Sequence, residues 1–152
     1  METTITTTNF VRAAVGLLAS LALGTAIASS HCLPSEKSFW SCAAGEKLYE
    51  VCISQPLKPG VGYMRYVAGR PGIPELTYPM KRVPPKGRFK YEMYARAGGI
   101  SFKIGAFEYL LSDNLTEPSE INVTDTRSNR STSTICEEKS EVLTLTSTIN
   151  LF

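Results

Sequence analysis

Four cysteines behind an apolar leader are the feature that most constrains this chain of 152 residues. Residues 13–28 form a run of 16 residues without charge or proline. A membrane-spanning helix needs about 20 apolar residues, whereas the apolar region of a signal peptide is shorter and ends at a small-x-small cleavage site. Such sites stand at 26–28 and 28–30. We expect residues 1–28 to be a signal peptide and residues 29–152 one domain; cleavage after Ser30 and a retained anchor are the alternatives.

All four cysteines lie after this leader: Cys32, Cys42, Cys52 and Cys136. An even number of cysteines behind an export signal is typical of disulfides in an oxidising compartment, so we expect a periplasmic or secreted protein. The nine-residue spacings between the first three differ from the close ligand pairs of zinc sites. Three pairings are open. A tight turn at 43–46 would bring Cys42 beside Lys47 rather than Cys52, which argues against a Cys42–Cys52 bridge. Of the two pairings that remain, we favour Cys42–Cys136 with Cys32–Cys52.

Short segments rich in β-branched and aromatic residues, separated by Gly and Pro, fill the rest of the chain. We expect strands at 47–53, 61–68, 75–78, 88–96, 100–104, 107–111, 120–124 and 141–148, with a further one near 134–136. No window after the leader has a sustained helical period. The pattern predicts an all-β domain, a disulfide-stapled antiparallel barrel or sandwich of about eight strands. Residues 29–41 read as a lead-in, and 112–134 as a long, mobile connection.

Alternation with period two assigns side chains to the core face of two of these strands. In 88–96 the core-facing set is Phe89, Tyr91, Met93 and Ala95. In 100–104 it is Ile100, Phe102 and Ile104.

Charge is unevenly distributed, although the formal net charge is only +2. Residues 32–103 hold 12 basic and 5 acidic side chains, and residues 104–152 hold 3 and 8. The candidate binding residues are Lys81, Arg82, Lys86, Arg88, Lys90, Tyr94, Arg96 and Lys103. This surface suits an acidic protein, an anionic polysaccharide or lipid headgroups, and the acidic half suits a cationic partner such as a lysozyme. A loop that only keeps strand edges soluble is the alternative. The small net charge argues against nucleic acid.

Catalytic groups are sparse. The single histidine, His31, excludes metal centres that need several imidazoles, and we expect the new N-terminus that carries it to be poorly ordered. It is the only base available to Ser35, Ser38 or Ser41. Carboxylates of a hydrolase pair would have to come from different strands: Glu46, Glu50, Glu92 and Glu108. We therefore expect no catalytic residue, no cofactor and no metal, and a small hydrolase is the least favoured reading.

Several short segments resemble small exported bacterial β-proteins: 42–52, 63–66, 75–79, Phe102-Lys-Ile-Gly105, Phe107-Glu-Tyr109 and the late Cys136. The same order is distantly similar to the periplasmic inhibitors of c-type lysozyme. That resemblance implies a small β-barrel held by a bridge between early and late cysteines. The Ser-Gly-x-Arg-Tyr loop of that family has no match here. The resemblance therefore implies the fold and the cellular compartment, but it does not imply inhibition of lysozyme.

We accordingly expect an exported, non-enzymatic binding protein, an inhibitor or immunity-type protein that acts on another protein. An envelope protein that binds anionic polysaccharide or lipid headgroups is the alternative.

Overall fold

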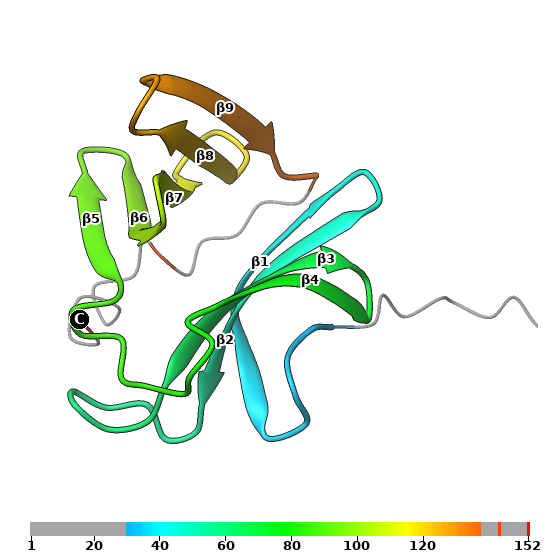
Figure 1. The fold of residues 1–152 in the computed structure, drawn as a ribbon, viewed down its shortest axis with the longest axis vertical. Coiled ribbons are helices and arrows are strands. Elements are labelled where there is room, and N and C mark those ends of the chain that lie inside the picture. The colour runs from blue at the N-terminus through cyan, green and yellow to red at the C-terminus, as the bar shows by residue number, and fades with distance from the viewer. Residues whose placement is uncertain (1–29, 138–142, 144–151) are drawn as a thin grey trace, which may run out of the picture.

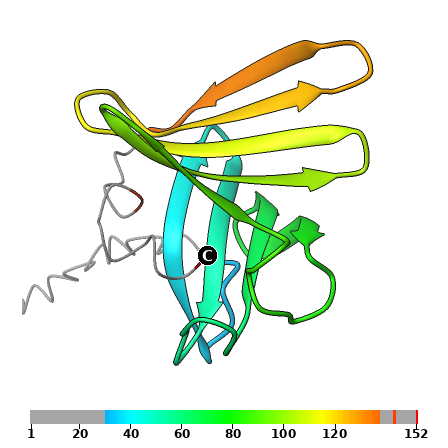
Figure 2. The same cartoon turned by 90° about the vertical axis from the view of Figure 1, so that its left-hand side faces the viewer.

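The computed structural model describes residues 30–137, 143 and 152 (Figure 1). These residues form two antiparallel sheets and no α-helix. The four-stranded sheet has the order β1 (Glu36–Ala44), β2 (Lys47–Ser54), β3 (Met64–Arg70) and β4 (Ile73–Tyr78). The five-stranded sheet has the order β5 (Lys90–Tyr94), β6 (Ala97–Ile104), β7 (Phe107–Asn114), β8 (Glu120–Asp125) and β9 (Arg130–Ile135). Figure 2 shows the strands of the second sheet running across those of the first.

The all-β prediction is confirmed, and the closed barrel among its alternatives is wrong. Within each sheet of the described residues, strands that follow each other in sequence pair antiparallel. β4 and β5 do not pair with each other, so the two sheets stay separate. The expected signal peptide at 1–28 lies outside the described residues. So does the expected strand at 141–148, apart from Leu143.

Two segments expected to be irregular are strands. The lead-in at 29–41 contains the first six residues of β1, including the buried Trp40, which pairs with β2 past a register shift between Ser38 and Trp40. The predicted mobile connection at 112–134 contains β8 and all but the last residue of β9, joined by a turn in which Asn129 has a φ of 53°. Ser and Thr suggested a loop there, but Thr fits well on a pleated strand.

The core lies between the inner faces of the two sheets. One sheet contributes Trp40, Val51, Met64 and Tyr66, and the other contributes Ile100, Phe102, Leu111 and Ile121. The predicted inward set of β6 is confirmed for Ile100 and Phe102, which are buried, and Ile104 is half-buried.

The predicted core face of 88–96 holds only at its beginning. Phe89 is buried and Tyr91 is half-buried, but Met93 is 58% exposed and Ala95 is also exposed. The reason is the position of β5 at the edge of its sheet. There Met93 lies opposite Gly98 of β6, which has no side chain to cover it.

A buried carboxylate ties the two sheets together inside this core. Asp113 of β7 is 0% exposed and accepts hydrogen bonds from Trp40 Nε1 of β1, Ser119 Oγ and the Leu143 backbone N–H, each 2.7 Å long. A buried charge is tolerated only where donors replace its water. The Trp40 indole therefore fixes β1 of one sheet against β7 of the other.

Trp40→Phe removes this indole donor and keeps an aromatic ring in the core. We expect the free energy of unfolding, measured by urea denaturation, to fall by about 1.5–3 kcal/mol, because hydrogen bonds to buried charges are worth that much. Tyr78→Phe is the control, since the Tyr78 hydroxyl makes only an exposed 3.5 Å hydrogen bond to the Arg88 carbonyl. Equal losses in both variants would contradict the assigned role of Trp40.

Two disulfides close the chain, in the pairing that the sequence favoured. Cys32–Cys52 joins the segment before β1 to β2 across 20 residues. Cys42–Cys136 spans 94 residues and joins β1 of one sheet to the residue after β9 of the other. Such a pair is typical of an oxidising, extracellular environment. No helix in the described part of the chain is long and apolar enough to cross a membrane.

Removing each disulfide by a double Cys→Ser substitution should cost more stability for the longer of the two loops, with a logarithmic dependence on loop length. In the chain-entropy model we expect a loss of about 4–5 kcal/mol for Cys42–Cys136 and about 3 kcal/mol for Cys32–Cys52. Urea denaturation of the two variants measures the difference. A larger loss at Cys32–Cys52 would show that the long bridge does not dominate.

Candidate functional site

Three parallel aromatic rings stack where the two sheets meet, and two of them, Tyr78 and Phe102, line the floor of a hollow. The Phe102 ring of β6 stacks between Tyr109 of β7 at 5.0 Å and Tyr78 of β4 at 5.2 Å. Phe89 packs edge-on against Tyr78 and Phe102, at 5.6 and 5.2 Å. Aromatic pairs of this kind stabilise the fold beyond what the buried area of the rings contributes. The stacked rings are therefore a fixed part of the core.

Basic side chains surround this floor. A cavity of about 480 Å³ lies here, and we call it the basic hollow. Its lining residues are Tyr78, Gly87, Arg88, Phe89, Lys90, Ser101, Phe102, Lys103, Glu108 and Phe152. It brings together three of the predicted binding residues, Arg88, Lys90 and Lys103. Lys103 Nζ lies 3.5 Å from Glu108 Oε2, and both side chains are largely exposed. The hollow therefore combines an aromatic floor with three cations and one carboxylate.

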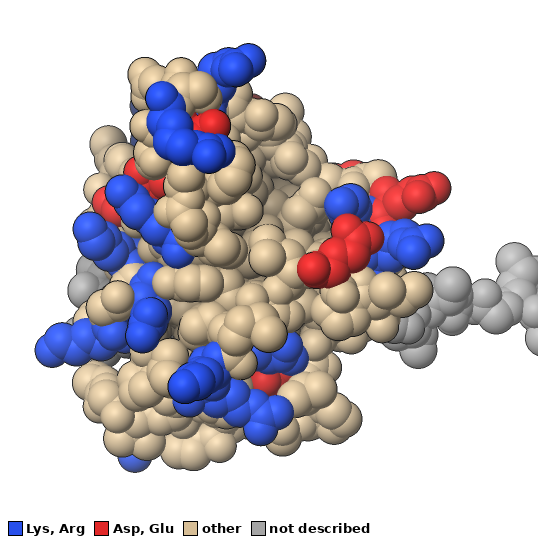
Figure 3. Space-filling view, viewed as in Figure 1, with Lys and Arg blue, Asp and Glu red and all other residues tan. Residues whose placement is uncertain are grey.

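The other basic residues of the β4–β5 connection precede Arg88 in the chain and do not line this hollow. Lys81, Arg82 and Lys86 are exposed, and the Arg82 guanidinium lies 5.3 Å from the Tyr63 ring centre. Within the described residues, no carboxylate forms an ion pair with any of the five cations between Lys81 and Lys90. Figure 3 shows Lys and Arg spread along one side of the molecule, with few carboxylates among them in its lower part.

The structure does not bring Tyr94 and Arg96 into the basic hollow. They line a separate open hollow of about 780 Å³ beyond the β5–β6 turn, together with Asn114, Glu117 and Ile135. Tyr94 is 50% exposed. The predicted set of eight residues thus divides into six around the β4–β5 connection and β6, and two at another place on the sheet.

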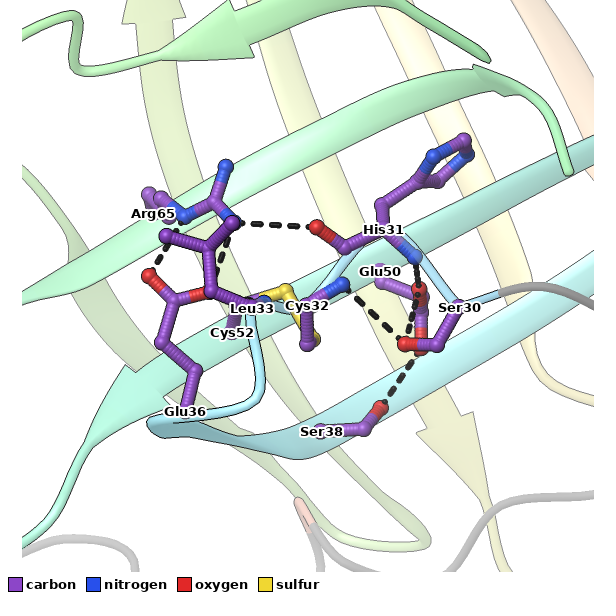
Figure 4. Close-up of polar contacts among 9 residues, drawn as sticks. All are labelled: Ser30, His31, Cys32, Leu33, Glu36, Ser38, Glu50, Cys52 and Arg65. Atoms are coloured by element: carbon purple, nitrogen blue, oxygen red, sulfur yellow. Dashed lines mark hydrogen bonds and ion pairs between the residues drawn. A yellow bond between two sulfur atoms is a disulfide. The ribbon is translucent and has the colours of Figure 1, made fainter. Parts of the chain in front are cut away.

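The N-terminal segment is held by a network that the sequence did not suggest (Figure 4). Glu50 of β2 is buried and accepts hydrogen bonds from Ser30 Oγ, Ser38 Oγ and the His31 backbone N–H. His31 is 7% exposed, so the expectation of a poorly ordered histidine is wrong. Its Nε2 contacts the Leu48 carbonyl at 3.1 Å rather than a serine hydroxyl. His31 is therefore a structural residue here.

A paired arginine and glutamate complete this network. Arg65 of β3 donates to both carboxylate oxygens of Glu36, at 2.7 and 2.6 Å, and to the His31 carbonyl at 2.9 Å. Burial alone would raise the pKa of Glu36, but the hydrogen bonds from Arg65 and the Leu33 backbone N–H outweigh it and hold that pKa below its usual range. The pair fastens β3 to the start of β1.

One group of metal-ligating residue types occurs among the described residues. Cys32, Cys52 and Glu50 place their ligand atoms within 4.8 Å of one another. The two sulfurs are bonded to each other as a disulfide, and Glu50 is saturated by the donors named above. The arrangement is that of a disulfide beside a buried hydrogen-bond network, and it offers no thiolate to a metal.

Two of the candidate carboxylates share a shallow hollow of about 210 Å³ on the outer face of the five-stranded sheet. Glu92 accepts a 2.7 Å hydrogen bond from Ser101 Oγ, and Glu108 is paired with Lys103. Glu46 and Glu50 do not line this hollow. Each of the two carboxylates thus has a structural partner, which gives little support to a hydrolytic pair.

Sequence reasoning missed the aromatic floor. The sequence predicts Phe102 as a core residue, but its stacking between Tyr78 and Tyr109 depends on how the two sheets face each other. The sequence offers Glu108 only as a candidate catalytic acid, whereas in the structure it lines the basic hollow. The only available signal was the Phe102-Lys103 pair, in which alternation places one residue inward and the next outward.

No protein-family model matches the chain, and neither a curated protein nor a solved structure is significantly similar to it.

The lowered pKa of Glu36 predicts a pH dependence of stability. A carboxyl whose pKa is lower in the folded state stabilises it above the unfolded pKa of about 4.3, and this contribution is lost as the pH falls through the folded pKa. We expect Glu36→Gln to lower the free energy of unfolding by about 1–3 kcal/mol at pH 7 and to flatten its fall between about pH 5 and 2.

The matched control is Glu75→Gln, which breaks the exposed 3.0 Å pair with Lys47. Exposed pairs are worth about 0–1 kcal/mol, so this variant should keep the wild-type pH profile. Urea denaturation at a series of pH values measures both. An unchanged profile in Glu36→Gln would refute the assignment.

Proposed function

We propose that this protein is an exported, non-enzymatic binding protein that holds an acidic segment of another protein in the basic hollow. The observation that carries the proposal is the arrangement of Arg88, Lys90 and Lys103 around the stacked rings of Tyr78 and Phe102. An inhibitor or immunity-type protein is the class of exported binder that fits this use.

Charge and shape support a protein partner. Small-molecule and peptide sites combine an apolar floor with a few placed polar groups, as the basic hollow does. Cations on the rim speed the encounter with an acidic partner and select against basic ones. A volume of about 480 Å³ can take side chains of a peptide segment. An apolar or aromatic residue flanked by Asp or Glu is the chemistry that complements it.

The second candidate is an envelope protein that binds anionic polysaccharide or lipid headgroups. The exposed cations that lie outside the hollow, Lys81, Arg82 and Lys86, favour it, because a flat polyanion needs charge but no pocket. The two candidates differ in whether the aromatic floor contributes to binding.

Export to the periplasm belongs to the same proposal. The leader at 1–28 and the two disulfides support it, since both are expected of a protein that folds outside the reducing cytoplasm.

A labelled peptide of glutamates with one central phenylalanine tests the proposal, with fluorescence anisotropy on oxidised protein from residue 29 onward. We expect saturable binding that Arg88→Glu/Lys90→Glu weakens about tenfold or more, because two attractive contacts become repulsive. Lys37→Glu/Arg130→Glu makes the same change in net charge on β1 and β9 and should shift the affinity less than about twofold.

Equal loss in both double variants would contradict a site at the basic hollow. If polygalacturonate or phosphatidylglycerol vesicles bind and the peptide does not, the envelope candidate replaces the protein partner. Absence of binding to all three probes would contradict both.

A further inference from the structure

The edge strand β9 differs from the other three sheet edges in having no protection against pairing. The edge β1 has a register shift, the edge β4 contains Pro74, and the short edge β5 carries Lys90 and Glu92. Bulges, prolines and charges are the devices that stop edge strands from pairing with other chains. β9 spans six residues, Arg-Ser-Thr-Ser-Thr-Ile, with regular pairing to β8 and its one charge at the first position.

The hydrogen-bond pattern shows which groups of β9 point away from the sheet. The Cys136 N–H donates to the Ser119 carbonyl at 2.9 Å, so this pair belongs to the hydrogen-bonded kind. Such pairs alternate along an antiparallel ladder, so Thr132 and Thr134 also bond to β8. The bond from the Thr126 N–H to the Ala106 carbonyl fixes the same alternation from the other side of β8.

It follows that Ser131, Ser133 and Ile135 turn their backbone N–H and C=O groups outward. Among the described residues none pairs with these three, although Glu137, the next residue on this side, donates its N–H to the Ala43 carbonyl of β1 at 2.8 Å. The two described residues beyond Glu137 both contact Tyr91 of β5, the strand at the opposite edge. The Leu143 carbonyl accepts a 2.6 Å bond from the Tyr91 hydroxyl, and Phe152 stacks on the Tyr91 ring.

We propose that the β9 edge is the self-association surface of this protein, where a second copy pairs antiparallel about a two-fold axis at Ser133. In this register Ser133 faces Ser133 of the second copy, and Ser131 faces Ile135 of the second copy. Every outward N–H and C=O of the three residues then finds a partner, and the two five-stranded sheets become one continuous sheet.

Side chains in this register are compatible with a second copy of the same chain. Thr132 faces Thr134 of the second copy, a favourable cross-strand pair, and no two like charges lie opposite each other. Ile135, which is 65% exposed, gains a neighbour in Ser131 of the second copy. The net charge of +2 gives little repulsion between copies. A two-fold contact is also the commonest symmetry of soluble oligomers.

Sedimentation equilibrium of the oxidised protein from residue 29 onward tests this inference, at concentrations from about 10 μM to 1 mM. We expect the mass to rise from monomer towards dimer. Ser133→Pro removes an outward N–H from each copy without touching the bonds to β8, and should weaken dimerisation about tenfold or more.

Ser133→Lys provides a second variant in case the proline disturbs the strand. It sets two like charges opposite each other across the axis and should also weaken the dimer, whereas Ser128→Lys, in the turn before β9, should not. A chain that stays monomeric throughout the range would overturn the proposal. A dimer unaffected by both Ser133 variants would place self-association elsewhere and overturn it too.

The register makes one further measurement decisive. Residues of a hydrogen-bonded pair have Cα atoms about 5.5 Å apart, within disulfide range, whereas the two Ser131 residues would lie about 14 Å apart. We expect Ser133→Cys to form an intermolecular disulfide and Ser131→Cys not to. Equal cross-linking of both would exclude this register.

Discussion

The buried Asp113 carboxylate is the interaction on which the arrangement of the two sheets depends. The two sheets share no strand pairing, so apart from the backbone bond from the Glu137 N–H to the Ala43 carbonyl their relative position depends on side chains. Apolar packing is not directional, whereas the bond from Trp40 to Asp113 fixes one strand of each sheet at one point. Cys42–Cys136 adds a covalent link between the same sheets two residues further along β1. A polar tie and a disulfide together set how the inner faces meet.

The basic hollow follows from that arrangement. Tyr78 ends the last strand of one sheet, and Phe102 and Tyr109 belong to the other, so their stack exists only when the sheets are held in this relation. The β4–β5 connection carries the chain from one sheet to the other and passes this stack with its cations. The proposed binding surface therefore lies on a rigid floor, with Arg88 on the connecting loop and Lys90 and Lys103 on strands. Loops on a fixed framework are the usual place for recognition.

Local patterns predicted much of the fold, and contacts between distant segments decided the rest. Alternation identified β6 and the buried Phe89, and the turn at 43–46 argued against a Cys42–Cys52 bridge but left two pairings open. Alternation could not show that Met93, on the edge strand β5, lies opposite a glycine, because that depends on the register of β5 and β6. The buried roles of His31 and Asp113 depend on partners far away in the chain and have no local signal. For the site, charge density identified the basic loop, but not the aromatic floor beneath it.

The most direct test of the central claim is to map binding by NMR on uniformly ¹⁵N-labelled, oxidised protein titrated with the glutamate–phenylalanine peptide. The account predicts that amide shifts concentrate at residues 87–90 and 101–103, which line the basic hollow, and that the resonances of β9 stay in place. Shifts spread evenly over the exposed lysines and arginines would mean non-specific charge attraction. Shifts centred on another part of the chain would contradict the assignment of the site.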